Sequence, residues 1–273
     1  SEDIIRAYAQ SFMLSADNAH GVHPNYMEKA DPTNRPYMNE GIVIKYNANQ
    51  KYTTDGISAG IFKEICKNEE INAYLKKGDE NLGQLGYTDH SQAHCVQVAR
   101  QAGKILERFG YSDHEIELVK IAGYMHDIGN AINRTHHAEY GALLANSLLK
   151  EMDMPLDDRI TIISAIGNHD ESTGSPEDVI SAALIIADKT DVRRSRVREK
   201  ERAAFDIHDR VNYAVTESKL KIEKDRSVIA LNLQVDEKIC SMYDYFEIFL
   251  GRMMLCRKSA EILGTTFKLT VNG

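Results

Sequence analysis

A histidine and an aspartate stand side by side, His126 and Asp127, at the end of an apolar helical stretch and just before Gly129. A neutral imidazole and a hard carboxylate together suit ions such as Mn, Fe, Mg or Zn. His94 precedes this pair and Asp188 follows it, and both lie on expected helices. Asp188 ends an apolar stretch, where an unpaired carboxylate is costly to bury. A metal ion shared by these four side chains would remove that cost.

An isolated His-Asp pair is weak support for a metal site, because the same pair also forms ordinary polar helix ends. The histidines around it favour a metal, since six of them gather in one part of the chain: His90, His94, His126, His136, His137 and His169. His90 lies one helical turn before His94, so the two side chains share a helix face. We weigh a metal contact of His90 equally against an indirect or substrate contact. His136 is expected to be exposed, because adjacent helix residues cannot share a face.

Positively charged side chains follow Asp188 along the chain. Such a run is ordinarily a solvated helix face, and for most of these side chains that interpretation holds. This run, however, starts directly after a proposed metal ligand, and Lys and Arg bind phosphate oxygens. We therefore predict substrate-binding roles for Lys189, Arg193, Arg194 and Arg196.

The apolar spacing predicts a mainly helical unit from about residue 68 onward. Strands are expected at 227–235 and 266–271, and we predict that they pair in a small C-terminal antiparallel β element. Residues 15–56 hold many Pro, Asn and Asp and indicate an irregular segment with one short strand at 42–46. The expected helices are 57–67, 91–109, 112–128, 136–152, 157–168, 176–194 and 237–263.

The composition of the chain argues against some classes of binding partner. The net charge of −8 does not favour nucleic acid or anionic membrane. No apolar run approaches the ~20 residues that span a bilayer. The four cysteines suggest no disulfide framework, which fits a reducing, cytoplasmic setting. We expect a small phosphorylated substrate as the partner and no membrane. Nucleic acid is not favoured but stays open, and a homodimer is a candidate assembly.

The order His94, His126-Asp127, Asp188 resembles the HD superfamily, a helical bundle of metal-dependent phosphohydrolases, over about residues 68–273. His137-Ala-Glu-Tyr-Gly141 and Ile166-Gly-Asn-His169-Asp-Glu171 resemble the extra motifs of members that bind two or more metals. The resemblance implies one or two divalent ions (Mn, Fe, Mg, Ni, Co or Zn), with His137 and His169 holding the second and Asp127 bridging. It also implies hydrolysis of a phosphomonoester or phosphodiester, a nucleotide being one candidate. The catalytic roles fall to Asp127, His90 and Lys189.

Residues from about 11 to 66 are similar instead to the aspartyl aminopeptidase family. The similarity rests on Ser11–Tyr26, Asn34-Arg-Pro36 and Gly41–Tyr52, in which Asp17 matches a zinc ligand and His23 an active-site histidine. A catalytic zinc site needs about three protein ligands, and the other ligands of that family have no match here. We therefore interpret residues 1–67 as an aminopeptidase-like fragment or extension joined to an HD domain at residues 68–273.

Other functions fit the same residues. An HD-fold di-iron oxygenase would use the same six ligands and would need oxygen for turnover. A non-catalytic nucleotide-binding sensor would bind its ligand without turnover. Aminopeptidase activity is disfavoured by the missing zinc ligands.

Overall fold

The computed structural model describes residues 58–198, 207–223, 225 and 227–273. The chain divides into two compact units, residues 1–61 and residues 62–273. The expected strand at 42–46 lies outside the described residues, as do Asp17 and His23. The domain boundary that we expect at residues 67 and 68 stays a prediction.

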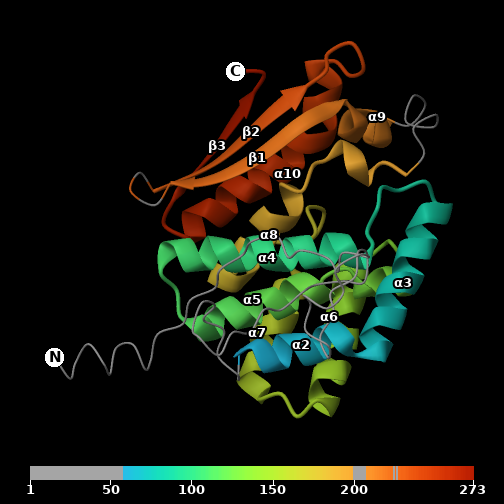
Figure 1. Ribbon diagram of the computed structural model, residues 1–273, viewed down its shortest axis with the longest axis vertical. Helices are drawn as coiled ribbons and strands as arrows, with labels where there is room; N and C mark the ends of the chain where they lie inside the picture. The colour runs from blue at the N-terminus through green and yellow to red at the C-terminus, as the bar shows by residue number, and fades with distance from the viewer. Residues whose placement is uncertain (1–57, 199–206, 224, 226) are drawn as a thin grey trace, which may run out of the picture. The chain divides into compact units, whose positions relative to one another are not determined.

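The second unit is mainly helical, as predicted (Figure 1). Most helices agree with the expected ranges to within a few residues, although α8 ends at Lys189 and does not continue to residue 194. The described helices that precede the sheet are α2 (Ser58–Lys67), α3 (Glu69–Gln84), α4 (Gln92–Phe109), α5 (Asp113–Met125), α6 (His137–Glu151), α7 (Leu156–Gly167), α8 (Val179–Lys189) and α9 (Ile207–Ala214), with short 3-10 helices at Ile128–Ala131 and Arg194–Arg196.

Local signals fix where the helices that carry ligands begin and end. Ser112 and Glu115 form a capping box that starts α5. Asp178 and Ser181 form another that starts α8. Gly110 ends α4 with φ 81°, a left-handed conformation that glycine adopts without steric cost. Each cap satisfies backbone groups that a helix end leaves unpaired, so the register of each ligand on its helix is set locally.

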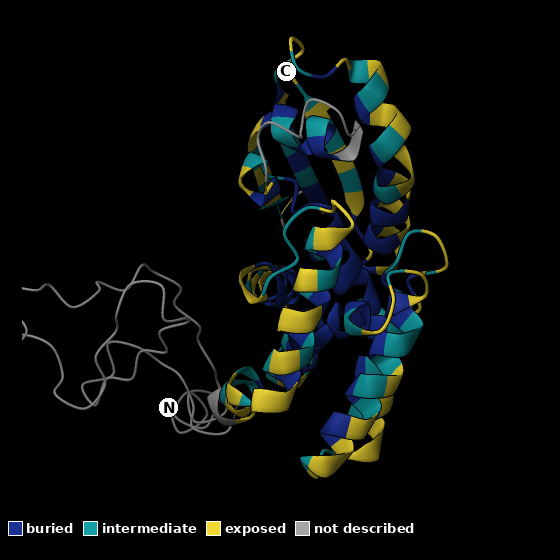
Figure 2. Ribbon diagram, turned by 90° about the vertical axis from the view of Figure 1, so that its right-hand side faces the viewer, coloured by how far each residue is buried: buried dark blue, intermediate teal, exposed yellow. Residues whose placement is uncertain are grey.

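Helix α8 lies at the centre of the core. Nearly all of its residues are buried, and it packs against α4, α5, α7 and α10 (Met242–Ile262). A helix that is apolar all round is stable only when other elements surround it. Figure 2 shows the buried residues gathered where the helices meet. The core therefore holds the last turn of α8, including Asp188, among the other ligand-bearing helices.

Two glycines allow those helices to approach one another closely. A Cβ at Gly123 on α5 would lie 2.8 Å from the Cα of Ala99 on α4. A Cβ at Gly129 would lie 1.9 Å from the carbonyl oxygen of His137, at the start of α6. Side chains at these positions would push the backbones apart. The two contacts bring the segment around His126 and Asp127 against both α4 and α6.

The C-terminal part adds a small sheet, β1 (Val215–Glu223), β2 (Val228–Val235) and β3 (Thr266–Val271), in that order. Strands β1 and β2 pair antiparallel, whereas β2 and β3 pair in parallel. Our prediction that the two expected strands form an antiparallel element is therefore wrong for that pair, and β1 was not predicted. The reason is the connection: α10 carries the chain back before β3 begins, so β3 runs in the direction of β2 (Figure 1).

The described helices include none that combines the length and apolar character needed to cross a bilayer.

Replacing Gly129 by Ala is expected to lower the free energy of unfolding by about 2–3 kcal/mol, because the new Cβ overlaps the backbone of α6. Gly251→Ala is the matched control, since nothing lies within 4 Å of a Cβ there and Ala favours a helix by up to about 1 kcal/mol. Urea unfolding of both variants measures the two effects. Equal stability of Gly129→Ala and the unchanged protein would contradict the close contact.

Candidate metal centre

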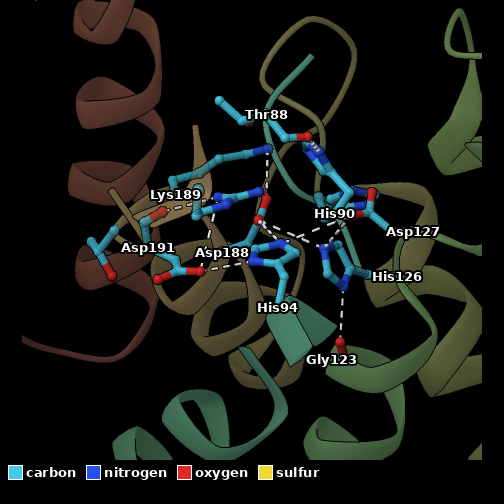
Figure 3. Close-up of polar contacts among 12 residues, drawn as sticks. Thr88, His90, His94, Gly123, His126, Asp127, Asp188, Lys189 and Asp191 are labelled. Carbon is cyan, nitrogen blue, oxygen red and sulfur yellow. Dashed lines mark hydrogen bonds and ion pairs between the residues drawn. The ribbon is translucent and has the colours of Figure 1, made fainter. Parts of the chain in front are cut away.

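Six histidine and aspartate side chains from five segments meet in the interior. His94 lies on α4, His126 and Asp127 directly follow α5, and Asp188 lies in the last turn of α8. Figure 3 shows these four side chains pointing toward one another. The other two are His137, the first residue of α6, and His169, which follows α7. All of the predicted metal ligands are therefore brought together in one cluster.

The first four side chains surround a common point. His126 Nε2 lies 3.2 Å from Asp127 Oδ2 and 3.6 Å from Asp188 Oδ1. His94 Nε2 lies 3.3 Å from Asp188 Oδ1 and 3.8 Å from Asp127 Oδ2. Both histidines are buried and the two carboxylates are nearly so. One donor atom from each of His94, His126 and Asp127 falls within 4.8 Å of the others, a spacing that a single metal ion can bridge.

In every histidine of the cluster, the ring nitrogen Nδ1 already contacts a hydrogen-bond acceptor. His94 Nδ1 contacts Asp191 Oδ2 at 2.7 Å. In the other three rings, Nδ1 contacts a backbone carbonyl oxygen. His126 Nδ1 lies 2.8 Å from Gly123 O, and His169 Nδ1 lies 2.6 Å from Ile166 O. His137 Nδ1 lies 3.1 Å from Arg134 O. A carbonyl or carboxylate accepts only, so each neutral ring carries its proton on Nδ1. Each Nε2 then presents a lone pair to the cluster, the arrangement typical of metal-binding histidines.

The residues present fit a divalent metal ion. His94 Nε2, His126 Nε2 and Asp127 Oδ2 are buried and have no hydrogen-bond partner among the described residues. Buried polar atoms without partners are costly, and these three face one another. Imidazole nitrogens combined with carboxylate oxygens suit Mn, Fe, Co, Ni or Zn, and the chain's donors do not choose among them.

A second group of donors adjoins the first and shares Asp127. Asp127 Oδ2 faces His94 and His126, whereas Asp127 Oδ1 lies 3.8 Å from His137 Nε2. His137 Nε2 and His169 Nε2 are 3.2 Å apart. Two lone pairs repel at that distance unless a positive charge lies near both. The grouping of Asp127, His137 and His169 therefore fits a second cation, with Asp127 placed to bridge.

The electrostatics of the cluster keep its carboxylates charged. Burial alone would raise the pKa of Asp127, but the neighbouring His126 holds it well below its usual value. The pKa of Asp188 is also lowered despite burial, chiefly by Lys189. Burial lowers the pKa of His126, yet Asp127 raises it overall to about 10. Without a metal ion, the ionised carboxylates therefore favour a proton on His126, and a bound divalent ion would take the place of that proton.

A cavity of about 520 Å³ opens onto this cluster, and Asp127, His137, His169 and Asp188 belong to its lining. Lys189 also lines it and is held by Glu171 Oε2 at 2.7 Å and Asp188 Oδ2 at 2.8 Å. The cavity is large enough for a small phosphorylated molecule.

The histidines outside the six-residue cluster differ in position. His90 lines the cavity, and its Nδ1 contacts the Thr88 carbonyl at 2.7 Å. Burial lowers the pKa of His90. His90 belongs to none of the candidate ligand groups among the described residues, so its place suits a contact with bound substrate or water. The His136 side chain is 57% exposed, as predicted.

The arginines that follow α8 are not all brought to the cavity. Arg196 lines it, but its guanidinium donates to the carbonyl oxygens of Asp89 and Asp191. Arg193 binds Asp191, and Arg194 donates to the Tyr213 carbonyl and stacks over the Tyr213 ring at 4.6 Å. Neither Arg193 nor Arg194 lines the cavity, so their positions do not support the predicted substrate-binding role. The sequence predicts a helix that continues to residue 194, whereas α8 ends at Lys189, so Arg193 and Arg194 do not lie on that helix.

Four residues near the site were not predicted to have a role there. Asp191 orients His94, and Asn130 donates to Asp127 Oδ1 at 2.8 Å. Arg252 on α10 binds Glu171 at 2.8 Å, and Arg134 lies beside His137. The positions of Asp191 and Asn130, each three residues after a ligand, were a usable signal. Nothing in the sequence near Arg252 indicated a contact with the metal centre.

Replacing Asp191 by Asn is expected to weaken divalent metal binding by about ten- to a hundredfold, because His94 loses the carboxylate that fixes its orientation. Isothermal titration calorimetry with Mn²⁺ measures the change. Asp158→Asn is the matched control, since Asp158 also pairs with a histidine, His114, at 2.8 Å but on the surface. Equal metal affinity in both variants would show that Asp191 does not support the site.

Comparisons with known proteins match two families to separate parts of the chain. The model of the HD domain matches residues 92–195, which carry all six clustered residues. The model of the aminopeptidase I zinc metalloprotease family (M18) matches residues 1–82.

Relatives among curated proteins include three called "Probable M18 family aminopeptidase 2". The protein of Clostridium acetobutylicum is 48% identical over 103 residues, which are 36% of this chain and 24% of that protein. The protein of Clostridium novyi is 45% identical over 122 residues, 41% of this chain and 28% of that protein. The protein of Pseudomonas savastanoi is 51% identical over 85 residues, 30% of this chain and 20% of that protein. The chain thus spans about a quarter of the length of these relatives. It carries an HD domain at residues 92–195, preceded by a fragment of the M18 aminopeptidase family at residues 1–82.

Proposed function

We propose that the HD domain hydrolyses a phosphomonoester or phosphodiester with the help of one or two divalent metal ions. The observation that carries the proposal is the cluster of histidines, each held through Nδ1 and each turning Nε2 toward buried carboxylates. The cluster opens onto a cavity that also presents cationic side chains. A bound metal ion of this type supplies an activated water and neutralises phosphate oxygens.

Three residues of the chain, Asp127, Lys189 and His90, are placed to position the metal ions and the substrate. Asp127 Oδ2 faces the ligand group that contains His126, and Asp127 Oδ1 faces the group that contains His137. Asp127 therefore fixes the spacing between the two groups. Lys189 is held at the cavity wall between two carboxylates and adds a positive charge where a phosphate would lie. His90, neutral because burial lowers its pKa, offers Nε2 as a proton or hydrogen-bond acceptor. These positions suit binding and orientation of an anionic ester.

The purified chain with Mn²⁺, Fe²⁺, Mg²⁺, Ni²⁺ or Co²⁺ is expected to release p-nitrophenol from p-nitrophenyl phosphate or bis-p-nitrophenyl phosphate. Asp127→Ala should lower the rate by at least about a hundredfold, because Asp127 belongs to both ligand groups. Asp158→Asn, far from the cavity lining, should retain the rate. The preferred ester separates a phosphatase from a phosphodiesterase. A metal-loaded protein that cleaves neither ester would contradict the proposal.

The same ligand inventory favours a second candidate, a di-iron oxygenase, because both donor groups share Asp127. Oxygen consumption by the iron-loaded protein without phosphatase activity would support it. Tight nucleotide binding without turnover would instead support a sensor. The match to M18 aminopeptidases makes a peptidase a further candidate, which the missing zinc ligands of that family disfavour. Release of an N-terminal Asp or Glu from a peptide by the pure protein would support that candidate.

A further inference from the structure

Four permanently charged cations line the cavity above the metal centre: Arg134, Lys189, Arg196 and Arg252. Three of them are held by oxygen atoms of the protein. Lys189 lies between Glu171 and Asp188, and Arg252 binds Glu171. Arg196 donates to backbone carbonyls and lies 3.9 Å from the Asp191 carboxylate. Their charges are largely satisfied within the fold.

Arg134 differs from the other three. Among the described residues, no carboxylate lies within ion-pair distance of it. The side chain is half-buried, and its guanidinium carbon lies 5.4 Å from the centre of the Tyr87 ring. Its Nη1 lies 3.2 Å from His137 Nε2. The Tyr87 ring therefore lies beside one face of the guanidinium, and Arg134 belongs to the lining of the cavity.

The contact between Arg134 and His137 has a chemical consequence. His137 Nδ1 is engaged by the Arg134 carbonyl, so Nε2 offers a single lone pair. Arg134 Nη1 can donate a hydrogen bond to that lone pair only while His137 is not a metal ligand. When His137 serves as a ligand, the guanidinium loses this acceptor and needs another within the cavity. Asp170 also lines the cavity and lies 4.0 Å from His137 Nδ1, but among the described residues it forms no ion pair with Arg134.

We propose that Arg134 binds an anionic oxygen of a phosphate group held in the cavity beside His137 and His169. This assignment rests on the proposed function and names a phosphate-binding residue for it. The planar guanidinium fork matches phosphate geometry, and a charge-assisted hydrogen bond in a half-buried site is strong. Arg134 thus joins Lys189 and Arg196, which also line the cavity, as a candidate contact of the substrate.

Inorganic phosphate binding to the Mn²⁺-loaded full chain, measured by isothermal titration calorimetry, tests the proposal without turnover. Arg134→Ala is expected to raise the Kd for phosphate about ten- to a hundredfold, the size of one charge-assisted hydrogen bond. Arg134→Lys keeps the charge but not the fork and should give a smaller loss. Arg257→Ala is the matched control, because Arg257 pairs with Glu261 on the exposed face of α10 and does not line the cavity.

Metal content of each variant is measured in parallel by plasma mass spectrometry. A phosphate Kd for Arg134→Ala within twofold of the unchanged protein, at equal metal content, would overturn the assignment. A loss of metal from Arg134→Ala, with phosphate affinity restored by excess Mn²⁺, would also overturn it, since Arg134 would then act only on the ligands. Unchanged protein that binds no phosphate would overturn it as well. Phosphate binding through Arg134 without ester hydrolysis would contradict the proposed function and leave this assignment standing.

Discussion

The structure depends on how two buried carboxylates, Asp127 and Asp188, are compensated. Transferring an ionised carboxylate from water into a protein interior costs several kcal/mol unless positive charge and hydrogen bonds replace its hydration. Here Lys189 provides part of that compensation to Asp188, and a metal ion shared by the two carboxylates with the imidazoles of His94 and His126 would provide the rest. The buried carboxylates are stabilised only when all of these groups are in place. The packing of the helices and the chemistry of the site therefore depend on each other.

The helices bring these side chains together because glycine residues allow their backbones to approach one another closely. Gly123 brings α5 onto α4, and Gly129 brings the turn after Asp127 onto α6. The central helix α8 supplies Asp188 from a segment buried on all sides, so that carboxylate has little freedom to move. Backbone carbonyls and Asp191 then orient the imidazoles through Nδ1. Precise ligand placement follows from rigid helix packing and a fixed second layer of hydrogen bonds.

Much of this could be predicted from the sequence, because ligand residue types and helical spacing are local signals. His94, His126, Asp127 and Asp188 were identifiable from residue type and from the apolar helices around them. Contacts made over long sequence separations were not: Arg252 reaches Glu171 from a helix that carries no ligand. Strand β1 was missed because its apolar signal is weak: charged side chains occupy every second position from Glu217 to Glu223, as suits an exposed edge strand. The direction of β3 depends on the crossover through α10, which the strand pattern alone does not encode.

The central claim is that a divalent metal ion binds where His94, His126, Asp127 and Asp188 converge. Anomalous X-ray scattering from crystals grown with Mn²⁺, recorded near the manganese absorption edge, tests it most directly. The account predicts a peak enclosed by the Nε2 atoms of His94 and His126 and by the carboxylates of Asp127 and Asp188, with a second peak between Asp127, His137 and His169 if two ions bind. Manganese peaks only at surface carboxylates, with the cluster closed by direct contacts among its own side chains, would contradict it.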